Sequence, residues 1–548
     1  MPAPLQDHER VVGSLLRARA QERGERPFCF VGDEGFTFAE IDQRSDQVAA
    51  GFAALGVKKG DRVAVLSPNR PEVLEIFYGL AKLGAIQVPL NAFLKGAFLR
   101  HQLAHSQASM LIADAAGVAA AEPLLDELSD LRAIVLLDED GAAPVRDGVA
   151  VHLYAAVVDT DEAPPQVEIG PADTMSIVFT SGTTGLPKGC VLSHGYYTRC
   201  GWTSAYGLDL SDTDAIYAPL PLFHGGGRML VLTAALILGI PVHFDIAFSA
   251  SKFMARATEV DATVVIAIGA MGMALLATPP SEADRAHRVH SMMVAPLTPE
   301  EQARFKDRFG IEPWVECYGQ TECVPLTVAQ RTGPRDRSGT GYEAPDLEVA
   351  LLDEQLRPVA DGEVGEICIR PRAPYAMFDG YWDQPQATLA AFSGLWYHTG
   401  DAGRKLPSGQ YSFVDRKKDA LRRRGENVSS IELETAIRLH PKVADVAIHA
   451  VPSPATEDDI KAVIVLVGGE TTDPEELFGF FRDNLPYYAL PRYVEFVDDL
   501  PRNAVNRVMK HVLKERPLSD GVWDFETLGL SVGRDDRRTT APTQSVGA

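Results

Sequence analysis

The chain has 548 residues, of which 46% are hydrophobic and 23% are charged, ordinary values for a soluble globular protein. One hydrophobic core does not support this length, so at least two domains are expected. The net charge of −23 disfavours nucleic acids and anionic membranes as partners, so an anionic ligand has to be met by local positive groups.

The six cysteines are scattered along the chain and include no Cys-x-x-Cys pair. This spacing argues against a structural zinc site and against a disulfide framework. Reduced cysteines in a cytoplasmic enzyme fit the pattern best.

The N-terminal part alternates between predicted helices and strands. Thr37 is expected to be a helix N-cap, because Glu40 follows it three residues later as in a capping box. Strand, helix and strand patterns then follow at residues 62–66, 71–83 and 84–90. Shorter strand patterns recur further along, at residues 110–113 and 133–137. This alternation predicts a layered α/β domain.

A short apolar run at residues 175–179 breaks into small residues and ends in Pro187-Lys188-Gly189. The backbone N–H groups of a glycine-rich loop, with hydroxyls and a lysine, can surround a phosphate. No Gly-Lys-Ser/Thr follows, so this is not the Walker sequence. The alternative is a solvent-exposed loop without a binding function. Such a loop requires neither the strand that precedes it nor the Pro-Lys-Gly sequence that follows it. The predicted phosphate-binding residues are Thr180, Ser181, Gly182, Thr183, Thr184, Gly185 and Lys188.

This loop resembles the phosphate-binding signature of the AMP-forming adenylating enzymes, which include acyl-CoA synthetases, adenylation domains and luciferases. The resemblance implies an α/β fold with a large, layered, multi-sheet N-terminal domain at residues 1–415, carrying the ATP and substrate sites. It implies a small, mobile α+β lid at residues 416–525, and residues 526–548 are expected to be a disordered tail. The amino-acid sequence of residues 416–433 most resembles that of carnitine/crotonobetaine-type CoA ligases.

A second match begins about 140 residues after the phosphate loop. It comprises Tyr318, Gly319, Gln320, Thr321 and Glu322. A tyrosine can stack on a flat base, and a threonine can donate to a phosphate. Glu322 is expected to hold Mg²⁺, which prefers carboxylate and phosphate oxygens.

The segment Thr399-Gly400-Asp401 matches the family's Thr-Gly-Asp. By resemblance, Asp401 accepts hydrogen bonds from the ribose hydroxyls and Arg416 also contacts the ribose. Without the resemblance, Asp401 reads as a turn residue.

Two segments resemble the family's acid-binding elements. Phe223 and His224 precede three glycines, and by the resemblance they are expected to border the substrate. The residues by themselves indicate only a glycine-rich turn with a surface histidine. Ala295 and Pro296 match an element that contacts adenine and substrate, with Val294 where the family has glycine. Arg228 either pairs with an anionic substrate group or is solvated, and the sequence favours neither.

The longest uncharged run, residues 262–281, contains two glycines and ends in Pro279-Pro280. It is predicted to be a buried strand and helix, with a membrane span the weaker alternative.

The small domain carries family features of its own. The resemblance places the hinge at Asp419 and the passage of a pantetheine arm at Gly425. The basic run 422–424 meets CoA phosphates or is simply solvated. A helix from 431 to 440, strands at 443–451 and 462–467, and a helix at 474–484 are predicted.

The chain departs from the family near its C-terminus, where Arg507 stands at the position of a lysine that bridges the acyl carboxylate and the α-phosphate. Arginine is larger, planar and forked, so the exchange is not conservative. Three alternatives follow. Arg507 takes over the role of the lysine, or Lys510 does so after a local shift of the chain. In the third, the first half-reaction uses a different, smaller nucleophile.

The resemblance implies AMP-forming activation of a small acid with ATP and Mg²⁺, most simply a carboxylate that passes to CoA. Thr180, Lys188, Glu322 and Arg507 are the expected catalytic residues. One alternative is a diazotase that adenylates nitrite and transfers it to an aryl amine in a biosynthetic pathway. Another is a non-catalytic nucleotide-binding relative. A homodimer is plausible for the family.

Overall fold

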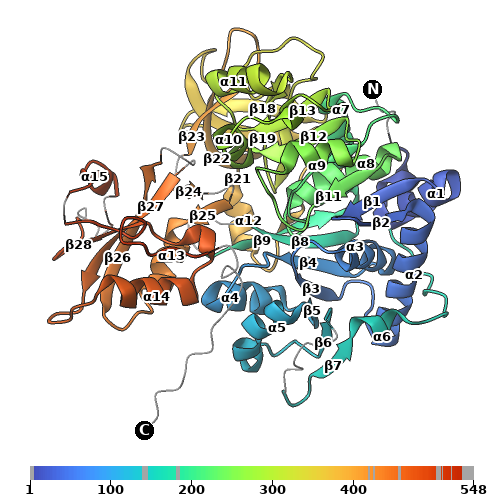
Figure 1. The fold of residues 1–548 in the computed structure, drawn as a ribbon, viewed down its shortest axis with the longest axis horizontal. Helices are drawn as coiled ribbons and strands as arrows, with labels where there is room; N and C mark the ends of the chain where they lie inside the picture. The colour runs from blue at the N-terminus through green and yellow to red at the C-terminus, as the bar shows by residue number, and fades with distance from the viewer. Residues whose placement is uncertain are drawn as a thin grey trace.

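The computed structural model describes residues 5–138, 146–180, 186–416, 420–423, 426–453, 458–501, 508, 510–519 and 521–533. A large domain carries the blue to yellow part of the chain, and a small domain in orange and red lies at its side (Figure 1). The sheets of the large domain use residues up to Arg416, and the small domain begins with a hairpin at Ala420.

The first sheet of the large domain has the order β20-β9-β8-β4-β3-β5-β6-β7. Its central pairs are parallel, while β9 pairs antiparallel with both β8 and β20. Its strands are β3 (Arg62–Leu66), β4 (Ile86–Leu90), β5 (Met110–Ala113), β6 (Ala133–Leu136), β7 (Ala150–Leu153), β8 (Thr174–Thr180), β9 (Lys188–Ser193) and β20 (Gly380–Tyr381).

The two faces of this sheet bury different side chains. In β3, Val63 and Val65 pack toward helices α2 and α3, while Ala64 and Leu66 pack toward α4 and α5. Alternate strand residues point to opposite faces, so helices cover both sides. These helices are α2 (Phe38–Ala54), α3 (Pro71–Leu83), α4 (Gly96–Ser106) and α5 (Ala115–Ala121).

The second sheet has the order β14-β13-β12-β10-β11-β1-β2 and is parallel except for the β1–β2 pair. Its strands are β1 (Pro27–Val31), β2 (Glu34–Thr37), β10 (Ile216–Tyr217), β11 (Val242–Phe244), β12 (Val264–Ile268), β13 (Ser291–Ala295) and β14 (Pro313–Trp314). Further helices of the large domain are α1 (Val12–Arg23), α6 (Tyr154–Val158), α7 (His194–Leu208), α8 (Thr233–Leu238), α9 (Phe253–Glu259), α10 (Gly269–Ala277), α11 (Pro299–Phe309) and α12 (Pro385–Ala391).

The largest core cluster joins the two sheets. It combines side chains of α3 and α7 with Val178 of β8, Cys29 of β1 and Val242 of β11. These helices therefore lie between the sheets, as the predicted layered architecture requires.

Antiparallel strands complete the large domain beside the second sheet. β15 (Cys317–Gln320), β16 (Cys323–Val328) and β17 (Tyr342–Glu343) form one sheet. The other contains β18 (Leu347–Leu352), β19 (Val364–Pro371), β21 (Phe392–Ser393), β22 (Trp396–Lys405) and β23 (Tyr411–Arg416).

The small domain combines a hairpin, a second sheet and short helices. Its strands are β24 (Ala420–Arg423), β25 (Glu426–Ser429), β26 (Val443–Pro452), β27 (Asp458–Leu466), β28 (Tyr493–Phe496) and β29 (Trp523–Asp524). Its helices are α13 (Ser430–Ile437), α14 (Pro474–Asn484) and α15 (Lys510–Lys514). Buried Arg423 pairs with Asp459 at 3.2 Å, which ties the hairpin to β27.

Local sequence signals predicted several of these elements correctly. The Thr37 side chain accepts a hydrogen bond from the Glu40 amide, and the Glu40 carboxylate accepts one from the Thr37 amide. The uncharged run forms buried β12 and then α10, as predicted. No helix in the described part of the chain combines the length and apolar character that a membrane span requires.

The predicted C-terminal tail lies partly outside the described residues. Trp523 pairs with β28 and Phe525 is buried, so the small domain continues at least this far. Leu530 packs against the same core, while residues 534–548 are not described.

Candidate active site

A cavity of about 2360 Å³ opens where the two domains meet. Residues of the large domain form most of its wall, and Glu426, Val428 and Glu432 of the small domain close another side. Predicted site residues that line it are Thr180, Lys188, Phe223, His224, Ala295, Pro296, Tyr318, Gly319, Gln320, Thr321, Glu322 and Asp401.

The predicted phosphate loop connects β8 to β9. Thr180 ends β8 and Lys188 begins β9, and the two residues are opposite each other in the antiparallel pair. The Lys188 Nζ atom lies 4.8 Å from the centroid of the Tyr381 ring. Tyr381 reaches this position because β20 pairs with β9. The loop residues 181–185 lie outside the described part of the chain.

Glu322 lies in the turn between β15 and β16 and is 7% exposed. Its Oε1 atom accepts a hydrogen bond of 2.9 Å from the Tyr381 hydroxyl. Burial raises the pKa of Glu322, and the Tyr381 hydroxyl and the Lys188 ammonium offset only part of that rise. A cation would favour the ionised carboxylate. One carboxylate beside a phosphate site suits Mg²⁺, which takes its other ligands from phosphates and water.

Asp401 is held by two donors from a neighbouring sheet. The Tyr318 hydroxyl donates to Asp401 Oδ2 at 2.5 Å, and Gln320 Nε2 donates to the same oxygen at 2.8 Å. Both donors come from strand β15, two residues apart, and reach the same carboxylate oxygen. Gly400 has a φ of 74°, a conformation that glycine adopts readily, and it turns the chain before Asp401.

Arg416 lies opposite Asp401 in the pairing of β22 with β23. The pairing brings the two predicted ribose-binding positions together. The side chain of Arg416 is outside the described part of the structure.

The acid-binding prediction falls on an apolar part of the cavity. Phe223 is 6% exposed, and its ring lies 4.7 Å from that of His224. Among the described lining residues of α10 and of the ends of β12 and β13, none is charged. They are Ile268, Gly269, Ala270, Met271, Met273, Ala274, Leu276, Ala277, Met293 and Ala295.

Arg228 occupies neither of the positions predicted for it. It is 2% exposed in the π-helical turn η3 (Gly226–Leu232), whereas Gly226, Gly227 and Leu230 of the same turn line the cavity. Its guanidinium donates to the Leu222 carbonyl and to Gln87 Oε1, the latter at 2.9 Å. Burial lowers the pKa of Arg228 to about 10. The helical turn directs this side chain into the interior, so it is not solvated, and it is not among the residues that line the cavity.

His224 connects the large domain to the small one. Its Nε2 atom lies 2.7 Å from Glu426 Oε1. Burial opposes the charge on His224, but the Glu426 carboxylate outweighs it and raises the pKa of the imidazole. Beside this contact, the rings of Phe93 and Tyr487 meet edge to face at 4.9 Å between centroids. The β24–β25 hairpin is therefore held against the cavity.

Several predicted residues lie outside the described part of the chain, namely Asp419, Gly425 and Arg507. Lys510, the alternative to Arg507, is described. Its Nζ atom donates to Ser430 Oγ at 2.7 Å and pairs with Glu434 at 2.7 Å. In this arrangement Lys510 belongs to the interior contacts of the small domain, and it does not line the cavity.

Sequence reasoning missed two residues of the site, Tyr381 and Glu426. Tyr381 lies about 60 residues beyond Glu322 in a segment without a motif. Glu426 lies beside the basic run and has no local feature that indicates a histidine partner. Only strand pairing and domain contact bring these residues to the cavity.

Comparison with known proteins gives consistent matches over most of the chain. A model of the AMP-binding enzyme family matches residues 16–382, and a model of the AMP-binding enzyme C-terminal domain matches residues 432–507. Crotonobetaine/carnitine–CoA ligase of Salmonella typhimurium is 34% identical over 494 residues, covering 87% of this chain and 93% of that protein. The ligase of the same name from Escherichia coli is 34% identical over 499 residues, with the same coverage of both chains.

Solved structures share the fold. A double mutant of o-succinylbenzoate CoA synthetase from Bacillus subtilis, bound with a product analogue, superposes with a TM-score of 0.79 at 24% identity. That comparison covers 93% of this chain and 99% of the synthetase. The same synthetase in complex with AMP gives a TM-score of 0.64 at 24% identity, over 93% of this chain and 98% of that one.

Proposed function

The chain belongs to the AMP-binding enzyme family and is an AMP-forming ligase, and from this premise we propose that it joins a small organic acid to CoA through an acyl-adenylate. One observation carries the proposal. Lys188 of β9, Glu322 of the β15–β16 turn and Asp401 of β22 line one cavity, which the small domain closes.

The nucleotide is proposed to bind along the side of the cavity formed by β8, β9, β15 and β22. Lys188 neutralises phosphate charge, and the Tyr381 ring on which it rests limits its movement. Asp401 accepts from the ribose hydroxyls. Two hydrogen bonds from Tyr318 and Gln320 fix the carboxylate beforehand, which lowers the cost of ordering it on binding.

Glu322 and the ATP phosphates would hold Mg²⁺, whose charge, when it is bound, offsets that of the departing pyrophosphate. The raised pKa of Glu322 fits this role, because a buried carboxylate without a cation binds a proton more readily.

In the first half-reaction, a carboxylate oxygen forms a bond to the α-phosphorus while the bond to pyrophosphate breaks. In the second, the CoA thiol sulfur bonds to the acyl carbon, AMP leaves and the thiol proton passes to solvent. The protein has little covalent chemistry to perform, so its residues act by positioning and by charge neutralisation. Arg507 is proposed to supply the positive charge between acid and α-phosphate.

The position of the small domain against the cavity favours the second half-reaction, the transfer to CoA. The β24–β25 hairpin lies at the cavity through Glu426, while Lys510 is turned into the small domain. The overall likeness to o-succinylbenzoate CoA synthetase is greater for the complex with the product analogue than for the complex with AMP. We therefore propose that the small domain rotates between two positions, with Asp419 as the hinge and Gly425 beside the pantetheine arm.

The apolar wall of α10 favours an acid with an uncharged body. Burial of such a body against methionine side chains contributes roughly 25 cal/mol per Å² of apolar area. A permanent cation, as in carnitine, would lose hydration there without gaining a carboxylate partner from α10, β12 or β13.

The nitrite-activating alternative would use Arg228 to pair with a carboxylate of the aryl amine, and Arg507 in place of the usual lysine. The first of these residues is buried away from the cavity. The second, Arg507, lies outside the described residues. A non-catalytic nucleotide-binding relative would use the same ribose contacts at Asp401, so the pyrophosphate assay is what separates it from an enzyme.

The test is pyrophosphate release from ATP and Mg²⁺ with a panel of aliphatic and aryl acids, carnitine and nitrite, each with and without CoA or an aryl amine. Release with an apolar acid, increased by CoA, supports the proposal. Release with nitrite and an aryl amine but with no organic acid overturns it, and so does tight ATP binding without any release.

A further inference from the structure

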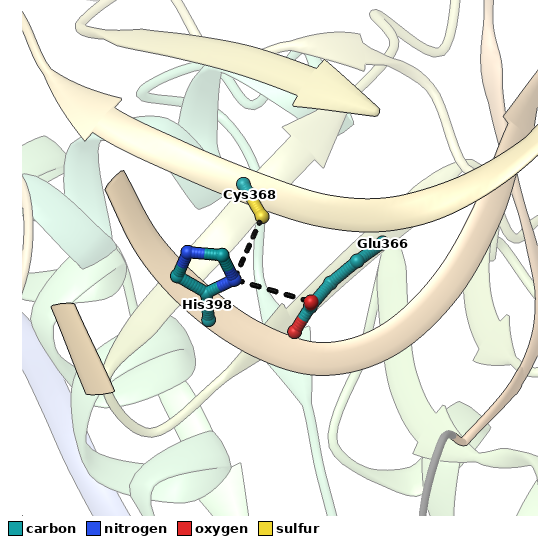
Figure 2. Close-up of side chains that lie close together, drawn as sticks. All are labelled: Glu366, Cys368 and His398. Atoms are coloured by element: carbon teal, nitrogen blue, oxygen red, sulfur yellow. Dashed lines mark hydrogen bonds and ion pairs between the residues drawn. The ribbon is translucent and has the colours of Figure 1, made fainter. Parts of the chain in front are cut away.

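Three side chains with different metal-binding atoms converge beside the nucleotide part of the cavity. Glu366 and Cys368 lie two residues apart on β19, and His398 lies on the neighbouring strand β22. Cys368 and His398 are register partners in this antiparallel pair. Figure 2 shows one ring nitrogen of His398 facing both the sulfur of Cys368 and the carboxylate of Glu366.

The distances between these atoms suit a tetrahedral cation. His398 Nδ1 lies 3.4 Å from Cys368 Sγ and 3.1 Å from Glu366 Oε2, and the three ligand atoms lie within 4.8 Å of one another. Zn²⁺ binds sulfur at about 2.3 Å and nitrogen or oxygen at about 2.0–2.2 Å, which separates neighbouring ligands by roughly 3.3–3.6 Å. Small movements of these side chains would therefore complete the coordination.

The second nitrogen of His398 determines which atom faces the cluster. His398 Nε2 lies 3.3 Å from the carbonyl oxygen of Ser393. A carbonyl oxygen can only accept, so this contact favours the tautomer with the proton on Nε2. The Nδ1 lone pair then points toward the thiol and the carboxylate. A backbone carbonyl is one of the usual partners of a metal-binding histidine.

The cluster is supported from behind and reachable from the cavity. The Gly400 amide donates to Glu366 Oε1 at 3.1 Å, while Glu366 Oε2 faces the imidazole. The side chains of Glu366 and His398 are 13% and 17% exposed, and both line the cavity. Buried Cys368 closes the inner side. A cation can therefore enter, and its fourth position would face the cavity.

From this arrangement we propose that Glu366, Cys368 and His398 form a binding site for Zn²⁺, separate from the Mg²⁺ position at Glu322. A neutral imidazole, a thiolate and a carboxylate together carry two negative charges, which one divalent cation neutralises. A thiolate and an imidazole select Zn²⁺ over the hard ion Mg²⁺. Three protein ligands with an open fourth position are the pattern of an accessible zinc site.

The competing explanation is a hydrogen-bonded cluster, in which a proton between His398 and Glu366 replaces the metal. Spectroscopy separates the two, because Co²⁺ in a zinc site with a thiolate ligand gives a sulfur-to-cobalt charge-transfer band in the near ultraviolet. The full chain is freed of metal with a chelator, kept reduced with a phosphine, and titrated with Co²⁺ and then with Zn²⁺ as competitor, both without nucleotide.

We expect one Co²⁺ per chain with a thiolate band, displaced by Zn²⁺. Cys368→Ser should abolish the band. His398→Gln and Glu366→Gln, at less buried positions, should each weaken Zn²⁺ binding by at least about tenfold. The matched control is Cys317→Ser, which removes a cysteine that also lines the cavity but lies outside the cluster, and which should keep the band.

Absence of a thiolate band in the wild-type protein overturns the proposal. It is equally overturned if Cys368→Ser keeps the band, or if the glutamine variants bind Zn²⁺ as tightly as the wild type. Circular dichroism of each variant shows whether the fold is retained. The outcome does not depend on whether the chain is a CoA ligase, because no substrate is present.

Discussion

His224 of the large domain and Glu426 of the small domain meet at 2.7 Å between Nε2 and Oε1. The contact joins the segment after β10 to the β24–β25 hairpin, about 200 residues further along the chain. It lies on the cavity wall, so the position of the small domain and the shape of the site depend on the same pair.

Docking of the β24–β25 hairpin should weaken as pH rises. The docked-state pKa of His224 is raised above its ordinary value of 6.5, so the ion pair stabilises docking below that value. The stabilisation is lost as pH rises through the raised pKa. Hydrogen exchange of residues 426–429 at about pH 6 and about pH 9, corrected for intrinsic rates, measures this difference.

Glu426→Gln should remove the pH response of the hairpin, because the neutral amide does not favour a protonated imidazole. The control Asp445→Asn breaks an ion pair with Arg438 inside the small domain and should keep the response. An unchanged response in Glu426→Gln would show that another group controls docking.

Asp401→Asn should reduce kcat/KM for ATP by about 10²-fold or more. Tyr318 and Gln320 both donate to Oδ2, so the asparagine carbonyl oxygen takes that position and its NH2 group, which cannot accept from the ribose, replaces Oδ1. Initial rates of pyrophosphate release against ATP concentration provide the measurement. Asp353→Asn in an exposed turn is the control, and equal kinetics in both variants would contradict the assigned role.

Tyr381→Phe should shift the Mg²⁺ dependence of the reaction to higher concentrations by about tenfold. The lost hydroxyl leaves Glu322 with one donor fewer, so the pKa of the carboxyl rises further and the proton competes better with the cation. Glu322→Gln should lower kcat by about 10²-fold or more at any Mg²⁺ concentration. A Tyr381→Phe enzyme with the wild-type Mg²⁺ dependence would refute this link.

Mild acid should destabilise the large domain through His194. Burial lowers the pKa of this fully buried imidazole to about 4, although Asp173 opposes the shift. The unfolded chain takes up the proton near pH 6.5, so stability is complete above that pH and is lost as pH falls toward 4. The loss from this group at pH 5 is about 2 kcal/mol.

The measurement is the change in Tm between about pH 7 and about pH 5 for the wild type and His194→Asn. Asparagine retains an acceptor near the position of Nδ1, which accepts from the Val12 amide. The variant should lose less stability on acidification than the wild type. The exposed His8→Gln control should behave like the wild type, and a His194→Asn protein with an equal acid response would argue against the assignment.

Arg228→Met should lower stability without changing KM for the acid. The substitution leaves the Leu222 carbonyl and Gln87 Oε1 without this donor, at a cost of about 1–3 kcal/mol for each group. Thermal unfolding and initial rates across acid concentrations separate the two effects. A raised KM for the acid with an unchanged Tm would show that Arg228 contacts the substrate.

Contiguous motifs were predicted well from the sequence because their geometry is local. Residues 318–322 occupy one strand and its following turn, so their common placement on the cavity follows from their spacing. The capping box at Thr37 and the alternation of helices and strands are local in the same sense.

Arg228 shows where local reasoning fails. It follows three glycines and Phe223-His224, and its neighbours Gly227 and Leu230 do line the cavity. The direction of one side chain within a helical turn depends on the phase of that turn and on the available acceptors. Those acceptors, Gln87 and Leu222, come from separate segments.

By itself, the sequence determined the family resemblance, the succession of elements and the nucleotide motifs, because each depends on residues close together in the chain. The tertiary structure alone decided that Tyr381 touches Glu322, that Glu426 meets His224, and that Cys368 and His398 face each other. Strand register and domain docking create these contacts. Both arise from burial of apolar surface that distant segments share, so these contacts cannot be predicted from the spacing of residues within one segment.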